Sequence, residues 1–211
     1  MAQNTINFKI TAKGFIGMLL GNLILGLGIA IFKLSGLGND PFSAMMMALA
    51  DRTPLEYAAL TAILNTFFFV IEFLFGKRLI GPGTIVNWFF LAYFVTFFYT
   101  KLPLVLATPQ SIVSHTLYLL VGVTVVSFGV SLYQASNSGV APYDSISLIM
   151  AEHLPIPYFW CRLSNDVLCA LICFLAGGLL GIGTLVCALF LGPFIHFFNQ
   201  TITYKLMGHT V

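Results

Sequence analysis

Gly81-Pro82-Gly83-Thr84 recurs as Gly181-Ile182-Gly183-Thr184, and this repeated stretch decides how the rest of the chain is interpreted. The two 18-residue blocks that begin there share nine identical residues at an offset of 100 positions. Asn65 matches Asn165 at the same offset. The sequence therefore predicts two copies of one unit, over residues 14–100 and 115–200, within a single domain spanning residues 1–211.

Weaker matches extend the repeat upstream. With small shifts they pair Gly21 with Gly122, Gly28 with Gly129, and Ser35-Gly36-Leu37-Gly38 with Ser138-Gly139-Val140-Ala141. Each of these Gly-rich turns precedes a helix-like stretch of about ten residues, which at 1.5 Å per residue covers ~15 Å, or half a bilayer. The stretches are residues 41–50 and 143–151. Such half-helices either re-enter the membrane or lie at its surface.

The composition places the chain in a lipid bilayer. Hydrophobic residues make up 59% and charged residues only 8%, against about 25% charged residues in soluble domains. The net charge is only +2 and no basic run is present, which excludes a nucleic-acid-binding protein. Four cysteines without CxxC spacing or a histidine pair are interpreted as small apolar core residues.

Six apolar runs have about the 20 residues needed to cross a hydrocarbon core of ~30 Å. They lie at 14–33, 56–76, 83–100, 114–134, 157–177 and 183–201. The predicted fold is therefore an all-α integral membrane bundle of two three-helix repeats, each with one short half-helix. Because a repeat of three spans is odd, the second copy runs through the membrane inverted relative to the first, and a site is expected near the midplane.

Basic residues near the ends of the spans predict the orientation. Cytoplasmic N- and C-termini place Lys9, Lys13, Lys77, Arg78 and Lys205 inside, against Lys33, Arg52 and Lys101 outside. The first apolar run follows two lysines and is interpreted as an uncleaved span rather than a signal peptide. The expected location is the bacterial plasma membrane, with several passes.

The fifth run carries the strongest polar signal. Arg162, Asn165 and Asp166 interrupt an otherwise apolar helix, and Arg162 and Asp166 are spaced to share one face. Ionisable residues at such depth cost about 2.5–3.5 kcal/mol each and usually face the bundle interior. These residues either bind a polar solute or form a neutralised pair that only holds the helix in place.

The second run carries a matching polar stripe. Thr61 and Asn65 are expected to face the fifth run, and Glu72 follows on the same side of the helix. Asp166 is the first candidate for a proton carrier and Glu72 the second. Glu72 precedes Lys77 by five residues, so extension towards the cytoplasmic surface explains it equally well.

Two acids lie at the starts of the half-helices. Asp40 precedes Pro41, the order typical of an N-cap followed by the first helical position. Asp144 follows Pro142 by two residues, so the two acids occupy different places in their turns. They either cap the helices or, if the helices re-enter, contribute to a solute site together with the helix N-termini.

The sequence gives little support for catalysis. The four histidines are dispersed, HExxH and GxSxG motifs are missing, and no serine is paired with a base. We expect neither an enzyme nor a bound metal or cofactor. Gly17 and Gly21 form a GxxxG motif, which indicates close helix packing or, alternatively, a docking face for a partner.

The turn Ser138-Gly139-Val140-Ala141-Pro142-Tyr143-Asp144 and the segment from Gly181-Ile182-Gly183-Thr184 to Leu191-Gly192-Pro193-Phe194-Ile195 resemble the YczE/YyaS/YitT family of small bacterial polytopic membrane proteins. The resemblance covers about residues 14–200 and is closer to the YczE branch, since the soluble C-terminal domain of many YitT members is missing. It implies a polytopic membrane protein and no particular activity.

Three functions remain open at this point. The leading hypothesis is a transporter or permease for a small polar solute, with a central site between the repeats. A gradient would drive it, and protons are one candidate for the coupling ion. The second is a solute-binding subunit of a multi-subunit importer, similar in size to the capture subunits of vitamin importers. The third is a regulatory or assembly protein without a solute. Its partners are expected to be the bilayer, a small polar solute and either a partner subunit or further copies of the chain.

Overall fold

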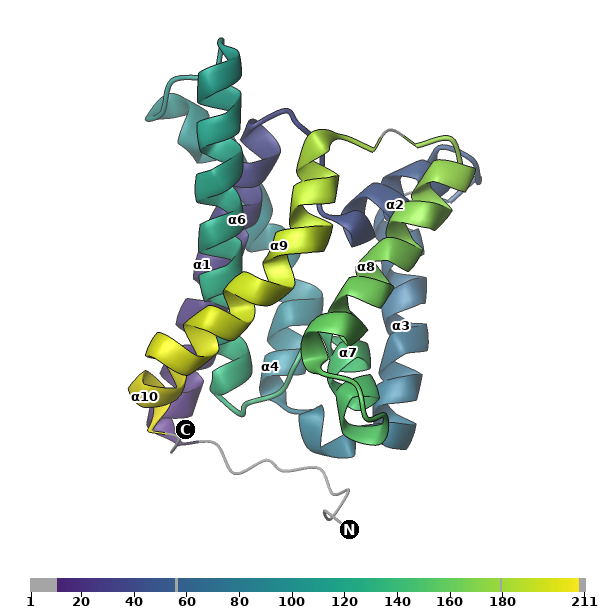
Figure 1. Cartoon of the computed structure of the whole chain (residues 1–211), viewed down its shortest axis with the longest axis vertical. Helices are drawn as coiled ribbons and strands as arrows, with labels where there is room; N and C mark the ends of the chain where they lie inside the picture. The colour runs from purple at the N-terminus through teal and green to yellow at the C-terminus, as the bar shows by residue number, and fades with distance from the viewer. Residues whose placement is uncertain (1–10, 56, 179, 209–211) are drawn as a thin grey trace.

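The computed structural model describes residues 11–55, 57–178 and 180–208, and all regular structure within them is helical (Figure 1). The longer helices are α1 (Ala12–Leu34), α3 (Tyr57–Phe75), α5 (Leu91–Lys101), α6 (Ile112–Ala135), α8 (Tyr158–Leu175) and α9 (Ile182–Phe198). The shorter ones are α2 (Pro41–Ala50), α4 (Pro82–Ile85), α7 (Pro142–His153) and α10 (Tyr204–Met207). Two π-helical segments, η2 (Val86–Phe90) and η4 (Asn199–Thr203), lie between α4 and α5 and between α9 and α10.

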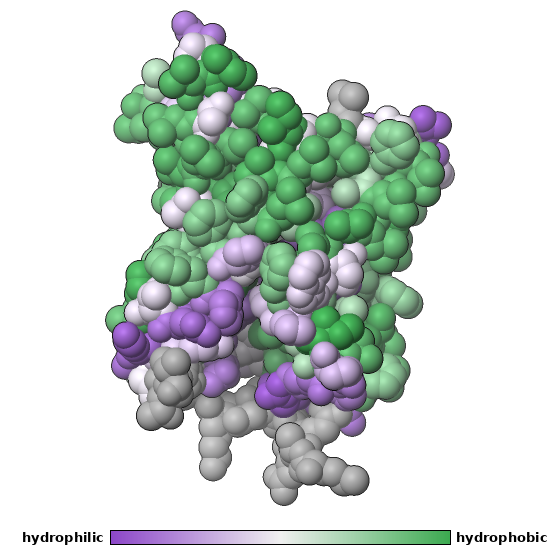
Figure 2. Space-filling model, in the orientation of Figure 1, coloured by the Kyte–Doolittle hydropathy of each residue, from purple (hydrophilic) through white to green (hydrophobic). Residues whose placement is uncertain are grey.

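Four helices are long and apolar enough to cross a membrane, and a bent pair makes a fifth candidate. The four spans are Ala12–Leu34, Ile112–Ala135, Tyr158–Leu175 and Ile182–Met207. The bent pair joins Pro82–Phe90 to Tyr93–Leu104 at an angle of 46°. Apolar side chains cover the middle and upper part of the face in Figure 2, and hydrophilic ones gather at its lower edge. The predicted helical membrane architecture is confirmed at this level of four or five spans.

The centre of the molecule is the packing of α1 against α6, the most extensive contact between any two of the described helices. The helices are antiparallel, because Gly21 lies against Tyr133 whereas Gly28 lies against Val126. The reciprocal contacts are Gly122 against Phe32 and Gly129 against Leu25. Each pair is therefore converted into its reciprocal pair by adding 101 to the number of the α1 residue and subtracting 101 from that of the α6 residue.

Gly17 and Gly21 are buried inside the chain by this packing and by α10. A Cβ atom built on Gly17 would lie 2.7 Å from Cε of Met207, and one on Gly21 would lie 2.5 Å from the backbone nitrogen of Tyr133. The GxxxG motif thus serves close helix packing, as the first of its two interpretations predicted. Its glycine surface is occupied by the protein's own side chains.

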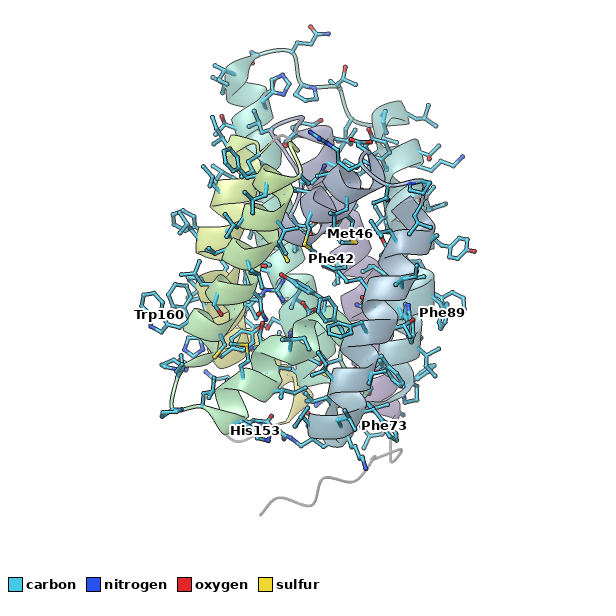
Figure 3. All side chains as sticks on the ribbon, turned by 90° about the vertical axis from the view of Figure 1, so that its right-hand side faces the viewer. Phe42, Met46, Phe73, Phe89, His153 and Trp160 are labelled. Atoms are coloured by element: carbon cyan, nitrogen blue, oxygen red, sulfur yellow. The ribbon has the colours of Figure 1, made fainter. Side chains whose placement is uncertain are left out.

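The two short helices start side by side and run apart. Phe42, the second residue of α2, stacks on Tyr143, the second residue of α7, with ring centroids 4.6 Å apart. Figure 3 shows Phe42 at mid-height, Met46 above it, and His153, the last residue of α7, at the lower edge. The N-termini of both half-helices therefore lie in the interior of the protein and not on its surface.

Each short helix packs on the long helix of the other half. The strongest partner of α2 is α8, and the strongest partner of α7 is α3. Ala44, Met45, Met46 and Ala48 of α2 form a buried cluster with Cys169 and Cys173 of α8. The four cysteines of the chain are free and buried, as predicted.

The Gly-x-Gly-Thr segments hold the turns that precede the short helices. The backbone amide of Gly183 donates to the carbonyl oxygen of Leu37 at 2.9 Å, and that of Gly83 donates to Ser138 at 2.6 Å. Gly38 and Gly139 follow these carbonyls with φ of +134° and +110°, a region that glycine adopts at little cost.

These turns correct the predicted alignment of the two copies. Matching identical residue types paired the serine and glycine of 35–38 with those of 138–141, an offset of 103 positions. The residues with positive φ in the two turns correspond at an offset of 101 positions instead. The equivalent of Gly36, with φ of +65°, is Asn137, with φ of +51°. Asparagine is one of the few residues other than glycine that tolerates this left-handed conformation, so identical letters were a poor guide to the register.

Candidate functional site

Three buried ionisable side chains meet where α7 and α8 pack together, and we call Asp144, Arg162 and Asp166 the charge cluster. Nη1 of Arg162 donates to Oδ1 of Asp144, and Nε of the same guanidinium donates to Oδ2 of Asp166 at 3.3 Å. Both contacts are ion pairs, and the three residues are between 1% and 7% exposed. The predicted pair on α8 is therefore one half of a three-residue cluster.

Two tyrosines complete the cluster. The hydroxyl of Tyr133 on α6 donates to Oδ2 of Asp144, and the hydroxyl of Tyr143 on α7 donates to Oδ1 of Asp166 at 2.7 Å. All four carboxylate oxygens of the cluster thus have a donor. Buried ionised groups are tolerated only when they are paired and hydrogen-bonded in this way. With both carboxylates ionised, the cluster carries one net negative charge.

The cluster lies directly beside the meeting point of the short helices. The guanidinium carbon of Arg162 lies 5.0 Å from the ring centroid of Tyr143, the same ring that stacks on Phe42. Asp144 occupies the first turn of α7, where the helix dipole stabilises a negative charge. Proline at the first position of both short helices, Pro41 and Pro142, fixes the starts of these helices next to the cluster.

Asp40 and Asp144 have different roles. The side chain of Asp40 accepts a hydrogen bond from the amide of Ser43 at 3.0 Å and caps α2. The corresponding N-cap of α7 is Ala141, which has no side-chain acceptor. Of the two predicted acids at the half-helices, only Asp144 is therefore a member of the charge cluster.

The structure does not bring Asn65 and Thr61 to the face of α8 that carries Asn165. The side-chain amide of Asn165 donates to the hydroxyl of Ser147 on α7 at 2.9 Å. Asn65 and Thr61 are half-buried on α3, whose main packing partners are α7 and α2. Among the described residues, no hydrogen bond joins either of them to the cluster. The expected facing of Asn65 and Asn165 has no support in these contacts, since α3 packs mainly on α7 and α8 mainly on α2.

Glu72 on α3 is fully buried, with an exposed fraction of 0%. Neither of its carboxylate oxygens has a hydrogen-bond partner in the part of the chain that the structure describes. The alternative of an extended side chain that reaches the cytoplasmic surface is therefore wrong for this residue. It lies on the helix that packs against α7, which carries Asp144 in its first turn.

A polar cavity of about 780 Å³ opens at the edge where α10 ends. Its lining includes Gln134, Asn137, Glu152, Tyr158, His196 and Gln200. None of the three members of the charge cluster lines this cavity. Two lining residues adjoin the cluster in the chain: Gln134 follows Tyr133, and Tyr158 lies one helical turn before Arg162 on α8.

Sequence reasoning missed Tyr133 and Tyr158. Tyr158 could have been found from its spacing of four residues to Arg162. Tyr133 lies near the end of a span without a local pattern, and only the packing of α6 brings it to the cluster. No group of three or more His, Cys, Asp or Glu side chains suited to a metal ion occurs among the described residues.

The comparisons with known proteins concern nearly the whole chain. An uncharacterized protein of Haemophilus influenzae is 28% identical over 179 residues, covering 85% of this chain and 80% of its own length. The uncharacterized membrane protein YczE of Bacillus subtilis is 24% identical and covers 84% of this chain and 81% of its own length. YyaS of the same organism is 25% identical, with 85% and 89% covered.

The predicted resemblance to YczE and YyaS is thereby confirmed, and the name of the first agrees with the apolar helices of this chain. No solved structure matches the chain. Residues 12–200 match the family of unknown function DUF6198. The chain therefore belongs to the DUF6198 family.

Proposed function

We propose that this protein is a transporter for a small polar solute, and that the charge cluster is its solute site. The observation that carries the proposal is the position of the cluster: buried ionisable groups lie beside two half-helix N-termini, and a polar cavity opens on residues that adjoin them in the chain. Polar and charged residues buried at membrane depth usually mark a solute or ion path. Broken or half-length helices with their termini at the site are a common transporter device.

The proposal includes two inverted repeats with six crossings, in which α3 is the additional span. Its support is the recurrence of contacts at an offset of 101 positions. The contact of Gly21 with Tyr133 recurs as that of Gly122 with Phe32, and the contact of Gly28 with Val126 recurs as that of Gly129 with Leu25. The first helices of the two copies, α1 and α6, are antiparallel. A pseudo-two-fold axis that passes between them in the membrane plane accounts for these observations.

Such an axis also accounts for the crossed packing of the halves. It exchanges α2 with α7 and α3 with α8, so the contact of α2 with α8 becomes the contact of α7 with α3. Phe42 and Tyr143 are equivalent under the same exchange and touch each other, as two residues beside such an axis would. The charge cluster lies on one side of this axis only, because Ser43 stands where the second copy has Asp144.

The proposed orientation has both ends of the chain in the bacterial cytoplasm. Lys13 lies near Gly208, and Arg78 lines the same cavity as Tyr204, so these basic residues share one edge of the molecule. Lys9, which also entered the prediction, lies outside the described residues. With this orientation the cavity is open to the cytoplasm in the conformation described, and transport requires a second conformation that opens the opposite side.

The proposal is tested by a thermal-shift screen of purified protein against metabolites, ions and vitamins, followed by uptake into liposomes. A solute that stabilises the wild-type chain is expected to lose its effect in Asp166→Asn and to keep it in Asp51→Asn, an exposed position at the C-terminal end of α2 that does not line the cavity. Tyr143→Phe serves as a milder variant if Asp166→Asn does not fold. An unchanged solute response in all cluster variants would contradict the assignment of the site.

A further inference from the structure

Glu72 is the one carboxylate within an apolar helix that the described structure leaves without a hydrogen-bond donor. It lies in the run Phe67-Phe68-Phe69-Val70-Ile71-Glu72-Phe73-Leu74-Phe75, and its exposed fraction is 0%. An ionised carboxylate in such surroundings is disfavoured by several kcal/mol unless a partner compensates it. The partner must therefore be sought among the charged groups of every element that packs against α3.

None of the basic groups near Glu72 is directed towards it. Nζ of Lys77 lies 5.0 Å from the ring centroid of Phe73, and Arg78 is paired with Glu152 of α7. The ring of His153 contacts the carbonyl oxygen of Ile149 at 2.9 Å. Lys77 and Arg78 follow the C-terminal end of α3, and the ring of His153 meets the edge of Phe75, three residues beyond Glu72, with ring centroids 6.5 Å apart.

The remaining titratable groups around α3 are acids. Asp144 lies in the first turn of α7, the helix that packs most extensively on α3, and it is already bound to Arg162 and Tyr133. Residues 41–50 of α2 contain no titratable side chain, and Asp40 and Asp51 stand only at its two ends. The helix that packs on Glu72's helix therefore contributes an acid of the charge cluster, whose cation Arg162 is already shared between two carboxylates.

We infer that Glu72 is a proton-binding site and, on the basis of the proposed function, the group that couples protons to solute binding. A proton neutralises the carboxylate without further ligands, whereas a metal cation needs several oxygen ligands that this site does not supply. Asp166 is the weaker candidate of the two that the sequence suggested, because both of its oxygens already accept hydrogen bonds from Arg162 and Tyr143.

Glu72 is coupled to the charge cluster through Asp144. Release of the proton places a second negative charge beside a cluster that already carries one, and this repulsion acts on the carboxylate that holds Arg162. A bound proton therefore favours the closed cluster, and its loss favours a rearrangement of Asp144 and Arg162. Because Glu72 is not exposed in the conformation described, exchange of the proton with water requires another conformation, as alternating access does.

The site is tested directly by reacting the wild-type protein in bilayers with dicyclohexylcarbodiimide, which adds to protonated carboxyl groups in apolar surroundings, followed by peptide mass spectrometry. Glu72 is expected to carry at least about tenfold more label than Asp144 or Asp166. This ratio corresponds to a tenfold difference in the equilibrium constant for protonation of the carboxyl groups. The label is expected to fall as the pH rises. Equal labelling of the three residues, or an unlabelled Glu72 at acid pH, would overturn the inference.

A second measurement uses the pH dependence of thermal stability. In Glu72→Gln the amide replaces the protonated acid, so the variant should match the wild type at acid pH and exceed it at alkaline pH, where the wild-type carboxyl is forced to ionise. Glu152→Gln is the matched control and should not change this dependence. The same loss of stability with rising pH in wild type and Glu72→Gln would count against the site.

Both measurements need no solute, so they separate this inference from the proposed function. Labelling and stability decide the proton site even if no solute is found. A solute response that depends on Asp166, together with a negative labelling result at Glu72, would leave a solute site without this proton carrier. If Glu72→Gln does not fold, the labelling of the wild-type chain still decides the question.

Discussion

Among single side chains, Arg162 is the one whose loss leaves the most unpaired charge in the interior. It binds Asp144 and Asp166, and both carboxylates would remain buried without a cation. Arg162→Met is therefore expected to lower the free energy of unfolding by about 3–5 kcal/mol, the usual cost of breaking one side of a buried ion pair. Thermal denaturation of the purified protein in detergent measures this loss.

Two further variants show whether the stability lost in Arg162→Met results from unpaired charge or from the altered shape of the side chain. In the triple variant Asp144→Asn, Arg162→Met and Asp166→Asn no unpaired charge remains, so most of the lost stability should return while the solute response stays absent. Arg78→Met is the surface control, since the Arg78–Glu152 pair is partly exposed and such pairs contribute about 1 kcal/mol or less. A triple variant as unstable as Arg162→Met alone would contradict this account.

The sequence was sufficient for the part of the cluster that lies on one helix. Arg162 and Asp166 are four residues apart, so their contact follows from helical geometry alone. Asp144 could be recognised as a candidate but not joined to Arg162, because their contact depends on how α7 packs on α8. The facing of Asn65 and Asn165 depends on packing in the same way, because identity at an equivalent position of a repeat does not show that two residues touch.

Among the helices, α1 and α6 set the position of the cluster through their glycines. A methyl group at Gly21 would lie 2.5 Å from the backbone of Tyr133, whose hydroxyl holds Asp144. Gly21→Ala is expected to destabilise the protein by about 1–3 kcal/mol, as overpacking of a tight contact does. It should also weaken the solute response, because Tyr133 moves with the backbone of α6.

Gly17→Ala is the matched control on the same face of the same helix. The methyl group there would meet the flexible end of the Met207 side chain, which can turn away. We therefore expect a change in stability of well under that of Gly21→Ala, measured under the same conditions. Equal effects of both substitutions would show that the contact of α1 with α6 is less constrained than its geometry indicates.

The helical elements were more predictable than their register. Five of the six apolar runs gave long helices to within a few residues, whereas the run 83–100 is divided into α4, η2 and α5 by a bend of 46°. Proline after a capping position gave the start of α2. The offset of 101 positions between the two turns could not be predicted from identical residues, because asparagine replaces glycine at the left-handed position of the second turn. The π-helical segments also lack a sequence pattern. Asn87 of η2 donates to Asn22 of α1 at 2.9 Å, a tertiary contact of the kind that sequence periodicity does not reveal.

For the molecule as a whole, the arrangement of short and long helices decides what the polar residues can do. Periodicity and composition predict that apolar helices surround a few polar side chains, but not that α2 and α7 start next to each other. That contact, made by Phe42 and Tyr143, converts two separate turns into one interior site. The two halves therefore have to be folded together before a site exists, and neither half contains the cluster and both short helices.

The direction in which α6 crosses the bilayer determines the side of the membrane on which the cavity opens. This helix has 24 residues, and at 1.5 Å per residue it is long enough to cross the ~30 Å hydrocarbon core. Thr108 precedes it and Asn137 follows it, and both residues are exposed. If the chain is oriented as proposed, they lie on opposite sides of the membrane, with Asn137 at the cytoplasmic mouth of the cavity.

A membrane-impermeant maleimide should therefore label Thr108→Cys in intact cells and Asn137→Cys only after the cells are made permeable. The wild-type chain is the control, and its four buried cysteines should react slowly. Labelling of both positions from outside would mean that α6 does not cross, and labelling of Asn137→Cys alone would reverse the orientation. In the expected case, added solute should slow the reaction of Asn137→Cys, because the solute enters through the cavity that this residue lines.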